Sequence, residues 1–173
     1  MPYSAKAIAN YFIDRALIEE KPLSPMKVQK LVYYSHGWHI AIQGKPLINE
    51  QVEAWKFGPV IRTLYAELAA YGNRNISAKI ASYEIERSAT GGIIVKPRTP
   101  EIGNSTEEDH FARELMGKVW DTYGRYTAVQ LSNLTHAPGT PWDQVNKKYD
   151  ELLPKGTDIP TESIREYFVN QAK

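Results

Sequence analysis

Residues 24–42 read SPMKVQKLVYYSHGWHIAI, and this stretch decides the fold. Ser24 is a good helix N-cap, and Pro25 suits the first helical position, where its missing N–H is harmless. The sequence therefore predicts a helix from there to about Ile42. Helical spacing places the following residues on its core face: Val28, Leu31, Val32, Ser35, Trp38, His39 and Ile42. The opposite face is expected to carry Lys27, Lys30, Tyr33 and Gly37.

Start and stop signals on both sides of this stretch predict further helices. A mostly buried first helix follows the N-cap Ser4, and a last helix covers roughly residues 162–171. Between them, three more helices are expected to begin at Pro59, at a capping box over residues 105–108 and at a second box over residues 127–130.

Extended structure is expected in two places. Residues 52–57 alternate weakly as a short strand, and residues 81–87 and 92–96 carry the β-branched and aromatic content of a β-hairpin. The fold prediction is therefore a mainly α, single compact domain over residues 1–173, with about six helices and a small antiparallel hairpin. A length of 173 residues is usual for one domain.

Composition limits the function classes. Lys and Arg total 21 against 20 Asp and Glu, so the net charge of +1 supplies no field that would attract nucleic acid or a membrane. The chain has no cysteine, which excludes disulfides and thiolate metal sites. No secretory signal and no apolar run of about 18 residues is visible, so we expect a cytoplasmic protein without a membrane partner.

The motifs of common catalytic sites are missing. His36 and His39 are spaced i, i+3 on the predicted helix, but a core or interface role fits them better than a metal or base role. Ser35 has no nucleophile elbow around it, and no phosphate-binding loop occurs. We therefore predict no catalytic residue, no cofactor and no metal.

Basic residues around the predicted hairpin are the best candidate for a nucleic-acid patch. They are Arg74, Lys79, Arg87, Lys96 and Arg98. Three acidic residues, Glu84, Glu86 and Glu101, interrupt them, which favours a solvated strand edge over nucleic-acid binding.

Aromatic side chains near expected surface positions favour protein binding, because aromatic residues are common anchors of interfaces. They are Tyr33, Tyr34, Trp55, Phe57, Tyr65, Tyr71 and Trp142. Some of them are expected to close the core.

Two segments resemble the Panacea family, also called SocA-like. The first combines MKVQKLVYYSHGWH at residues 26–39 with GKPL at 44–47 and EAWKFGPV at 53–60. The second combines LSNLTH at residues 131–136 with the pair Pro141-Trp142. Together they frame nearly the whole chain.

This resemblance implies a mainly helical antitoxin that belongs to toxin–antitoxin pairs and has no established catalytic site. The expected function is neutralisation of a cognate toxin by direct binding, with a homo-oligomer also possible. We hypothesise that the toxin contacts are Tyr34, Trp55, Lys56, Phe57 and Tyr65, grouped where the chain turns into the third helix. The motif residues expected to hold the fold are Trp38, Gly58, Pro59, His136 and Trp142.

Two alternatives remain open at the level of sequence. One is a DNA-binding or phage-derived regulator, such as a repressor or antirepressor, because antitoxins often control their own operons. The other is an enzyme that uses His36, His39 or His136, with zinc as a conceivable metal.

Overall fold

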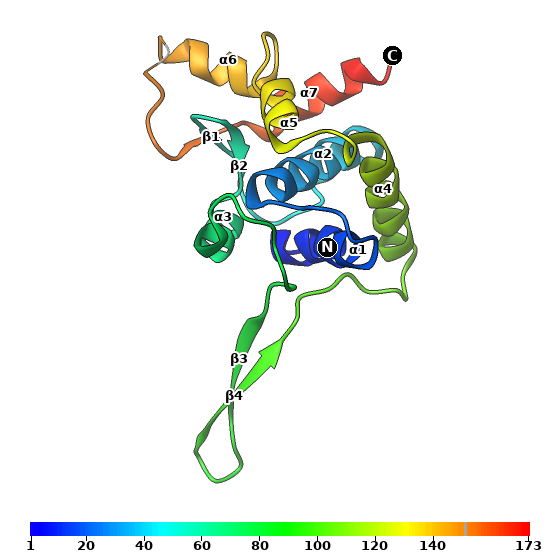
Figure 1. Cartoon of the computed structure of the whole chain (residues 1–173), viewed down its shortest axis with the longest axis vertical. Helices are drawn as coiled ribbons and strands as arrows, with labels where there is room; N and C mark the ends of the chain where they lie inside the picture. Colours follow the sequence, from blue (N-terminus) through cyan, green and yellow to red (C-terminus); the bar gives the residue numbers. More distant parts are fainter. Residues whose placement is uncertain (151) are drawn as a thin grey trace.

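A computed structural model describes residues 1–150 and 152–173, and it is mainly helical and compact (Figure 1). Its elements in chain order are α1 (Ala5–Ile18), α2 (Pro25–Gln43), β1 (Glu53–Trp55), β2 (Gly58–Val60), α3 (Arg62–Leu68), the 3-10 turn η1 (Ala69–Tyr71), β3 (Ser82–Arg87), β4 (Ile93–Arg98), α4 (Glu107–Tyr123), α5 (Ala128–Thr135), α6 (Pro141–Lys148), β5 (Thr157–Asp158) and α7 (Thr161–Gln171). The predicted fold class is confirmed, with seven α-helices in the described residues where about six were expected.

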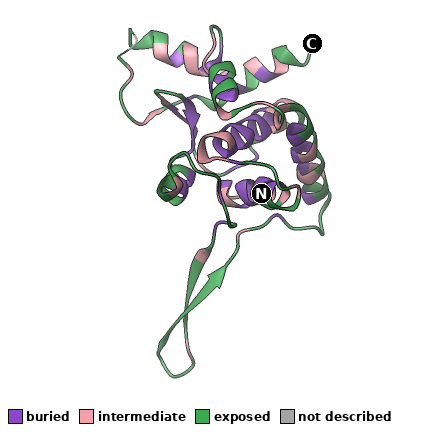
Figure 2. Cartoon of the chain, in the orientation of Figure 1, coloured by how far each residue is buried: buried purple, intermediate pink, exposed green. Residues whose placement is uncertain are grey.

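The helix α2 lies at the centre of the body, where it contacts α1, α4, α5 and α7 (Figure 1). Figure 2 shows that its residues are buried on nearly every side. The prediction that Lys30, Tyr33 and Gly37 face away from the core is wrong, because all three are buried. Ile42, expected inside, is exposed. Other elements cover most of this helix and only its C-terminal end is exposed, so its pattern shows no single apolar stripe.

One glycine lets α7 approach α2 closely. A Cβ atom on Gly37 would lie only 2.2 Å from Cε2 of Phe168 on α7. The Phe168 ring packs edge-on against Tyr33, Tyr34 and Trp38, at centroid distances of 5.8, 6.0 and 5.2 Å. The C-terminal helix therefore closes an aromatic core that α2 begins.

Capping boxes set the starts of α4 and α5. At α5, Thr127 and Gln130 bond each other's backbone N–H as predicted, at 3.1 and 2.8 Å. At α4 the predicted box is displaced by one residue, because the cap is Thr106 and its partner is Asp109. The Asp109 carboxylate also accepts a hydrogen bond from Tyr3 at 2.7 Å, which ties this helix start to the N-terminal segment.

The helix α6 was not predicted. Thr140 caps it, Pro141 occupies its first turn, and Asp143 adds a negative charge near its N-terminus. These three residues are a helix start signal, but the segment is short and only Pro141 and Val145 on it are buried.

A small sheet has the strand order β2-β1-β5. Trp55 at the end of β1 pairs with Gly58 at the start of β2, so Lys56 and Phe57 form the turn between the strands. Gly58 has a φ of +104°, a conformation that suits glycine. The extended segment predicted over residues 52–57 is confirmed at Glu53–Trp55, whereas Lys56 and Phe57 form the turn instead.

Pro59 does not begin a helix, contrary to the prediction, but lies in β2, and α3 begins three residues later at Arg62. Long-range contacts from α2 hold this segment extended. The Gln29 amide group bonds both the N–H and the carbonyl of Ile61, at 3.0 Å each, and Lys30 Nζ donates to the Pro59 carbonyl at 2.9 Å.

The predicted hairpin is confirmed as β3 and β4, which pair with Ser82 opposite Arg98. It projects away from the helical body (Figure 1), and nearly all of its residues are exposed (Figure 2). Within residues 1–150 and 152–173, no helix is both long and apolar enough to cross a membrane.

Candidate protein-binding surface

The β1–β2 turn presents two side chains to solvent. Phe57 is 57% exposed, and Lys56 is also exposed, with its Nζ 5.5 Å from the Phe57 ring centroid. Ser132 on α5 donates from its hydroxyl to the Phe57 carbonyl at 2.7 Å. The turn is therefore fixed to the body by its backbone while the Phe57 ring stays free.

Two aromatic rings lie beside this turn. Trp55 and Tyr65 pack with their ring centroids 4.7 Å apart, and about half of Tyr65 is exposed. The Trp55 indole N–H donates to Glu53 Oε2 at 2.7 Å, and Arg62 donates twice to the same carboxylate at 2.9 Å. This network fixes the orientation of the Trp55 ring.

These rings and the turn border a concave surface of about 370 Å³, here named the aromatic groove. It runs between the start of α2, the β1–β2 hairpin and α3. Its lining residues are Pro25, Met26, Gln29, Lys30, Trp55, Lys56, Phe57, Val60, Tyr65, Leu68, Ala69 and Gly72. Four of the five predicted toxin contacts, Trp55, Lys56, Phe57 and Tyr65, therefore lie in one place.

The charge of the aromatic groove is positive. Its lining contains two lysines and, among the described residues, no acidic side chain. Lys30 is buried, and burial lowers its pKa to about 7, so the exposed Lys56 is the lining residue that supplies a full positive charge. Lys155 Nζ lies 5.9 Å from the Trp55 ring centroid and adds a further cation beside the groove. Desolvation opposes ionisation of Glu53, yet hydrogen bonds from Arg62 and Trp55 lower its pKa. Its negative charge is therefore balanced by partners within the body.

Tyr34, the fifth predicted contact, lies elsewhere. It is only 8% exposed, and its ring stacks on that of Tyr123 with centroids 4.0 Å apart. It belongs to the aromatic core around Phe168 rather than to the groove. Helical spacing alone did not separate the two environments.

The motif residues make packing contacts. Trp38 donates from its indole N–H to the Tyr123 hydroxyl at 3.0 Å, and Trp142 donates to the Trp55 carbonyl at 2.6 Å. The His136 ring packs on Trp142 with centroids 5.3 Å apart. Through these contacts α6 supports the β1 strand that carries Trp55. At Gly58 a Cβ atom would lie 2.9 Å from Lys30 Nζ, and the Pro59 carbonyl accepts from that amine.

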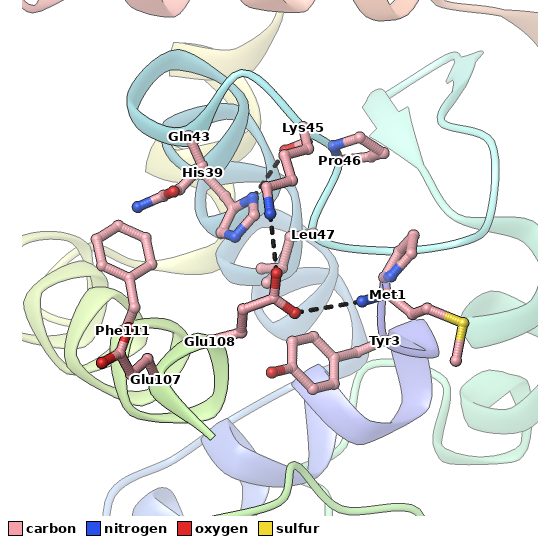
Figure 3. A pocket seen from close by; sticks show the side chains of 11 residues that line it. Met1, Tyr3, His39, Gln43, Lys45, Pro46, Leu47, Glu107, Glu108 and Phe111 are labelled. Atoms are coloured by element: carbon pink, nitrogen blue, oxygen red, sulfur yellow. Dashed lines mark hydrogen bonds and ion pairs between the residues drawn. The ribbon is translucent and has the colours of Figure 1, made fainter.

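A larger cavity of about 550 Å³ lies at the opposite end of α2 (Figure 3). Its polar groups bond one another. The Glu108 carboxylate accepts from Lys45 Nζ at 2.8 Å and from the Met1 amino group at 3.3 Å, and His39 Nδ1 lies 2.7 Å from the Lys45 carbonyl. These contacts join three chain segments, and they leave His39 engaged with backbone.

His36 is a buried histidine with a structural contact. The backbone N–H of Ile48 points to its Nδ1 at 3.4 Å. Desolvation, followed by the nearby His39, lowers the pKa of His36 to about 4. A neutral imidazole in this place serves as a hydrogen-bond acceptor.

Most cations of the predicted basic patch are paired. Lys79 binds Glu101 at 2.7 Å, Lys96 binds Glu86 at 2.7 Å, and Arg98 binds Glu84. Arg74 donates to backbone carbonyls at the end of η1. The acidic residues that interrupt the patch in the sequence thus form direct ion pairs with its cations.

Comparison with known proteins places the chain in a family. The family described as "Antitoxin SocA-like, Panacea domain" matches residues 28–143. The chain belongs to the SocA-like antitoxin family. The predicted resemblance is confirmed, and the matched range contains Trp55, Lys56, Phe57 and Tyr65. Membership supports an antitoxin role and favours a non-enzymatic one.

A curated relative agrees with this assignment. It is "Antitoxin SocA" of Caulobacter vibrioides (strain NA1000 / CB15N), which is 34% identical over 164 residues. The alignment covers 95% of this chain and 81% of the relative. No solved structure matches the chain significantly.

Sequence reasoning missed part of the groove. Met26, Lys30 and Lys155 come from segments far from the β1–β2 turn, and no local spacing connects them to it. Helical spacing predicts Lys30 on the face of α2 opposite the core, whereas its amine reaches across to β2. Only the adjacency of residues 55–57 signalled the site.

Proposed function

We propose that this chain neutralises a cognate toxin by direct, stoichiometric protein–protein binding, and that the aromatic groove is the contact surface. Family membership supports the antitoxin role. We choose this surface because Trp55, Lys56, Phe57 and Tyr65 all line one groove.

The groove has the physical character of a binding site. Trp and Tyr are enriched among residues that dominate binding energy, and both border it here. The turn that presents Phe57 is held by the Ser132 hydrogen bond and by the Gly58 conformation, so little conformational entropy remains to be lost on binding.

The positive lining defines the chemistry of the partner. An apolar side chain of the toxin would enter between the Phe57 and Tyr65 rings, and acidic residues next to it would face Lys56 and Lys155. Association should then slow as salt rises, because steering between exposed charges is screened.

The experiment compares two exposed apolar side chains of equal accessibility. Phe57 and Ile42 are both 57% exposed, but only Phe57 lines the groove. Phe57→Ala should weaken toxin binding by about 1–3 kcal/mol, or roughly 5- to 150-fold, and impair neutralisation in cells. Ile42→Ala should leave both unchanged.

Circular dichroism and thermal denaturation establish that both variants fold. Lys56→Glu provides a second test, since it reverses a charge without removing the aromatic ring. Toxin binding that survives both Phe57→Ala and Lys56→Glu in folded protein would refute the proposed surface. Binding lost equally in Ile42→Ala would also refute it.

A further inference from the structure

The β3–β4 hairpin has one apolar and one polar face. Residues directly opposite in an antiparallel pair lie on the same face, and successive residues alternate between faces. The register gives the first face three cross-strand rows: Tyr83 with Pro97 at the base, Ile85 with Val95 in the middle, and Arg87 with Ile93 toward the tip. This set of six residues is here named the apolar blade.

The apolar blade is open to solvent. Tyr83 is 70% exposed, and Ile85 and Ile93 are each 73% exposed. Figure 2 shows the hairpin exposed along its length, away from the buried body. A two-stranded hairpin is marginally stable in water unless something packs on its apolar face. An exposed apolar patch of this kind marks an interaction surface.

The other face of the hairpin is electrically satisfied. Lys96 pairs with Glu86, and Arg98 pairs with Glu84. Arg87, on the apolar blade, forms no ion pair with the described residues. The hairpin therefore offers a partner apolar surface and one free cation, both on the same face.

The base of the hairpin is fixed by the body. The buried Asn10 on α1 donates to the carbonyls of Ile80 and Pro100 at 2.9 Å each, and it accepts from the Ile80 N–H at 2.7 Å. Lys79 and Glu101 form an ion pair between the same two segments, which enter and leave the hairpin. One side chain thus holds both ends of the hairpin and fixes the direction of the blade.

We propose that the apolar blade is the interface of a homodimer, in which two hairpins pack face to face around a two-fold axis along the Ile85–Val95 row. Such an axis places Ile85 over Ile85 and Val95 over Val95 of the second copy. It also places Arg87 over Tyr83 of the second copy, where the guanidinium meets the face of an aromatic ring. The four strands form two layers and cover both apolar faces.

The order of the cross-strand rows favours a second copy of this chain as the molecule that covers the apolar blade. The free cation and the aromatic ring lie at opposite ends of the same strand, two residues on either side of Ile85. A two-fold axis exchanges those ends, so the blade complements itself and needs no acidic partner. The symmetric alternative, with an axis along the strands, sets both Arg87 side chains at the same end, where they repel.

The absence of cysteine allows a position-specific test. A single thiol introduced by Ile85→Cys lies on the axis and should give a dimer with a short bismaleimide. A thiol introduced by Glu84→Cys lies one residue away on the polar face and should not. Light scattering of the unmodified chain, without toxin, should give the mass of two chains, and Ile85→Asp should give the mass of one.

Every other result contradicts the proposal. A monomer in light scattering, with no cross-linking from Cys at position 85, would show that another partner or solvent covers the blade. Equal cross-linking from positions 84 and 85 would indicate random collision. A dimer that persists in Ile85→Asp would place the interface elsewhere. Phe57→Ala should leave the dimer intact, which separates this test from the test of toxin binding.

Discussion

The helical body and the β3–β4 hairpin differ in how far they bury their apolar side chains. Around α2 the body buries a lysine and a histidine together with the aromatic rings, and most of its large apolar residues are buried. The hairpin exposes Tyr83, Ile85 and Ile93 while it pairs its charges on the other face.

This difference separates stability from association. Burial of apolar surface supplies most of the free energy of folding, so the body should determine the stability of the chain. The hairpin adds little apolar burial within one chain, and its surface becomes useful only against another molecule. The aromatic groove lies between these extremes, with rings fixed by the body and faces open to solvent.

The largest expected effect tests the body. Phe168→Ala removes a buried ring that packs on Tyr33, Tyr34 and Trp38. The resulting cavity should reduce the free energy of unfolding by about 3–5 kcal/mol, as measured by urea denaturation. Ile94→Ala, on the polar face of the hairpin, should change it by less than about 0.5 kcal/mol. Similar losses in both variants would contradict the division between body and hairpin.

A second effect concerns the buried His36. Its folded pKa is about 4 and its unfolded pKa is about 6.5, so the unfolded chain binds more protons between these values. Stability contributed by the neutral imidazole is therefore complete above pH 6.5 and is lost as the pH falls toward 4. The loss should amount to roughly 3 kcal/mol, measured by denaturation across that range.

A substitution isolates this histidine. His36→Asn keeps an acceptor for the Ile48 N–H but cannot titrate, so it should flatten stability between pH 6.5 and 4. His110→Asn, at an exposed position, should retain the slope of the unmodified chain. An unchanged slope in His36→Asn would show that other groups cause the acid sensitivity.

The smallest of these effects lies at the junction of the two regions. Asn10→Ala leaves the Ile80 N–H and two carbonyl groups without their partner, which should cost about 1–3 kcal/mol. Amide hydrogen exchange should accelerate at Ile80 and through the hairpin, but not in α2. Protection that is unchanged at Ile80 would mean that Asn10 does not hold the hairpin base.

The sequence predicted those parts of the fold that local signals determine. The caps at Ser24 and Thr127 start helices as expected, and the β3–β4 hairpin lies where its composition indicated. Contacts between distant segments caused the errors. Gln29 and Lys30 hold residues 59–61 extended where Pro59 alone favours a helix, and Phe168 covers a face of α2 that was expected in solvent.

The candidate site was predictable to the same degree. Trp55, Lys56 and Phe57 are adjacent in sequence, and Tyr65 lies on the helix that follows. Their grouping was therefore visible, although Tyr34 was placed with them and lies in the core. The contributions of Met26 and Lys155 depend on how α2 and the segment after α6 fold around β1, which no local pattern encodes.

The most direct test of the central claim is site-specific photo-cross-linking to the toxin. A photoreactive phenylalanine analogue at position 57 retains an aromatic ring at the groove, and the same analogue at position 42 occupies an equally exposed site outside it. Irradiation of the complex with the cognate toxin should yield a one-to-one cross-linked product from position 57 and none from position 42. A product from position 42 alone, or from neither position in a complex that still forms, would contradict toxin capture by the aromatic groove.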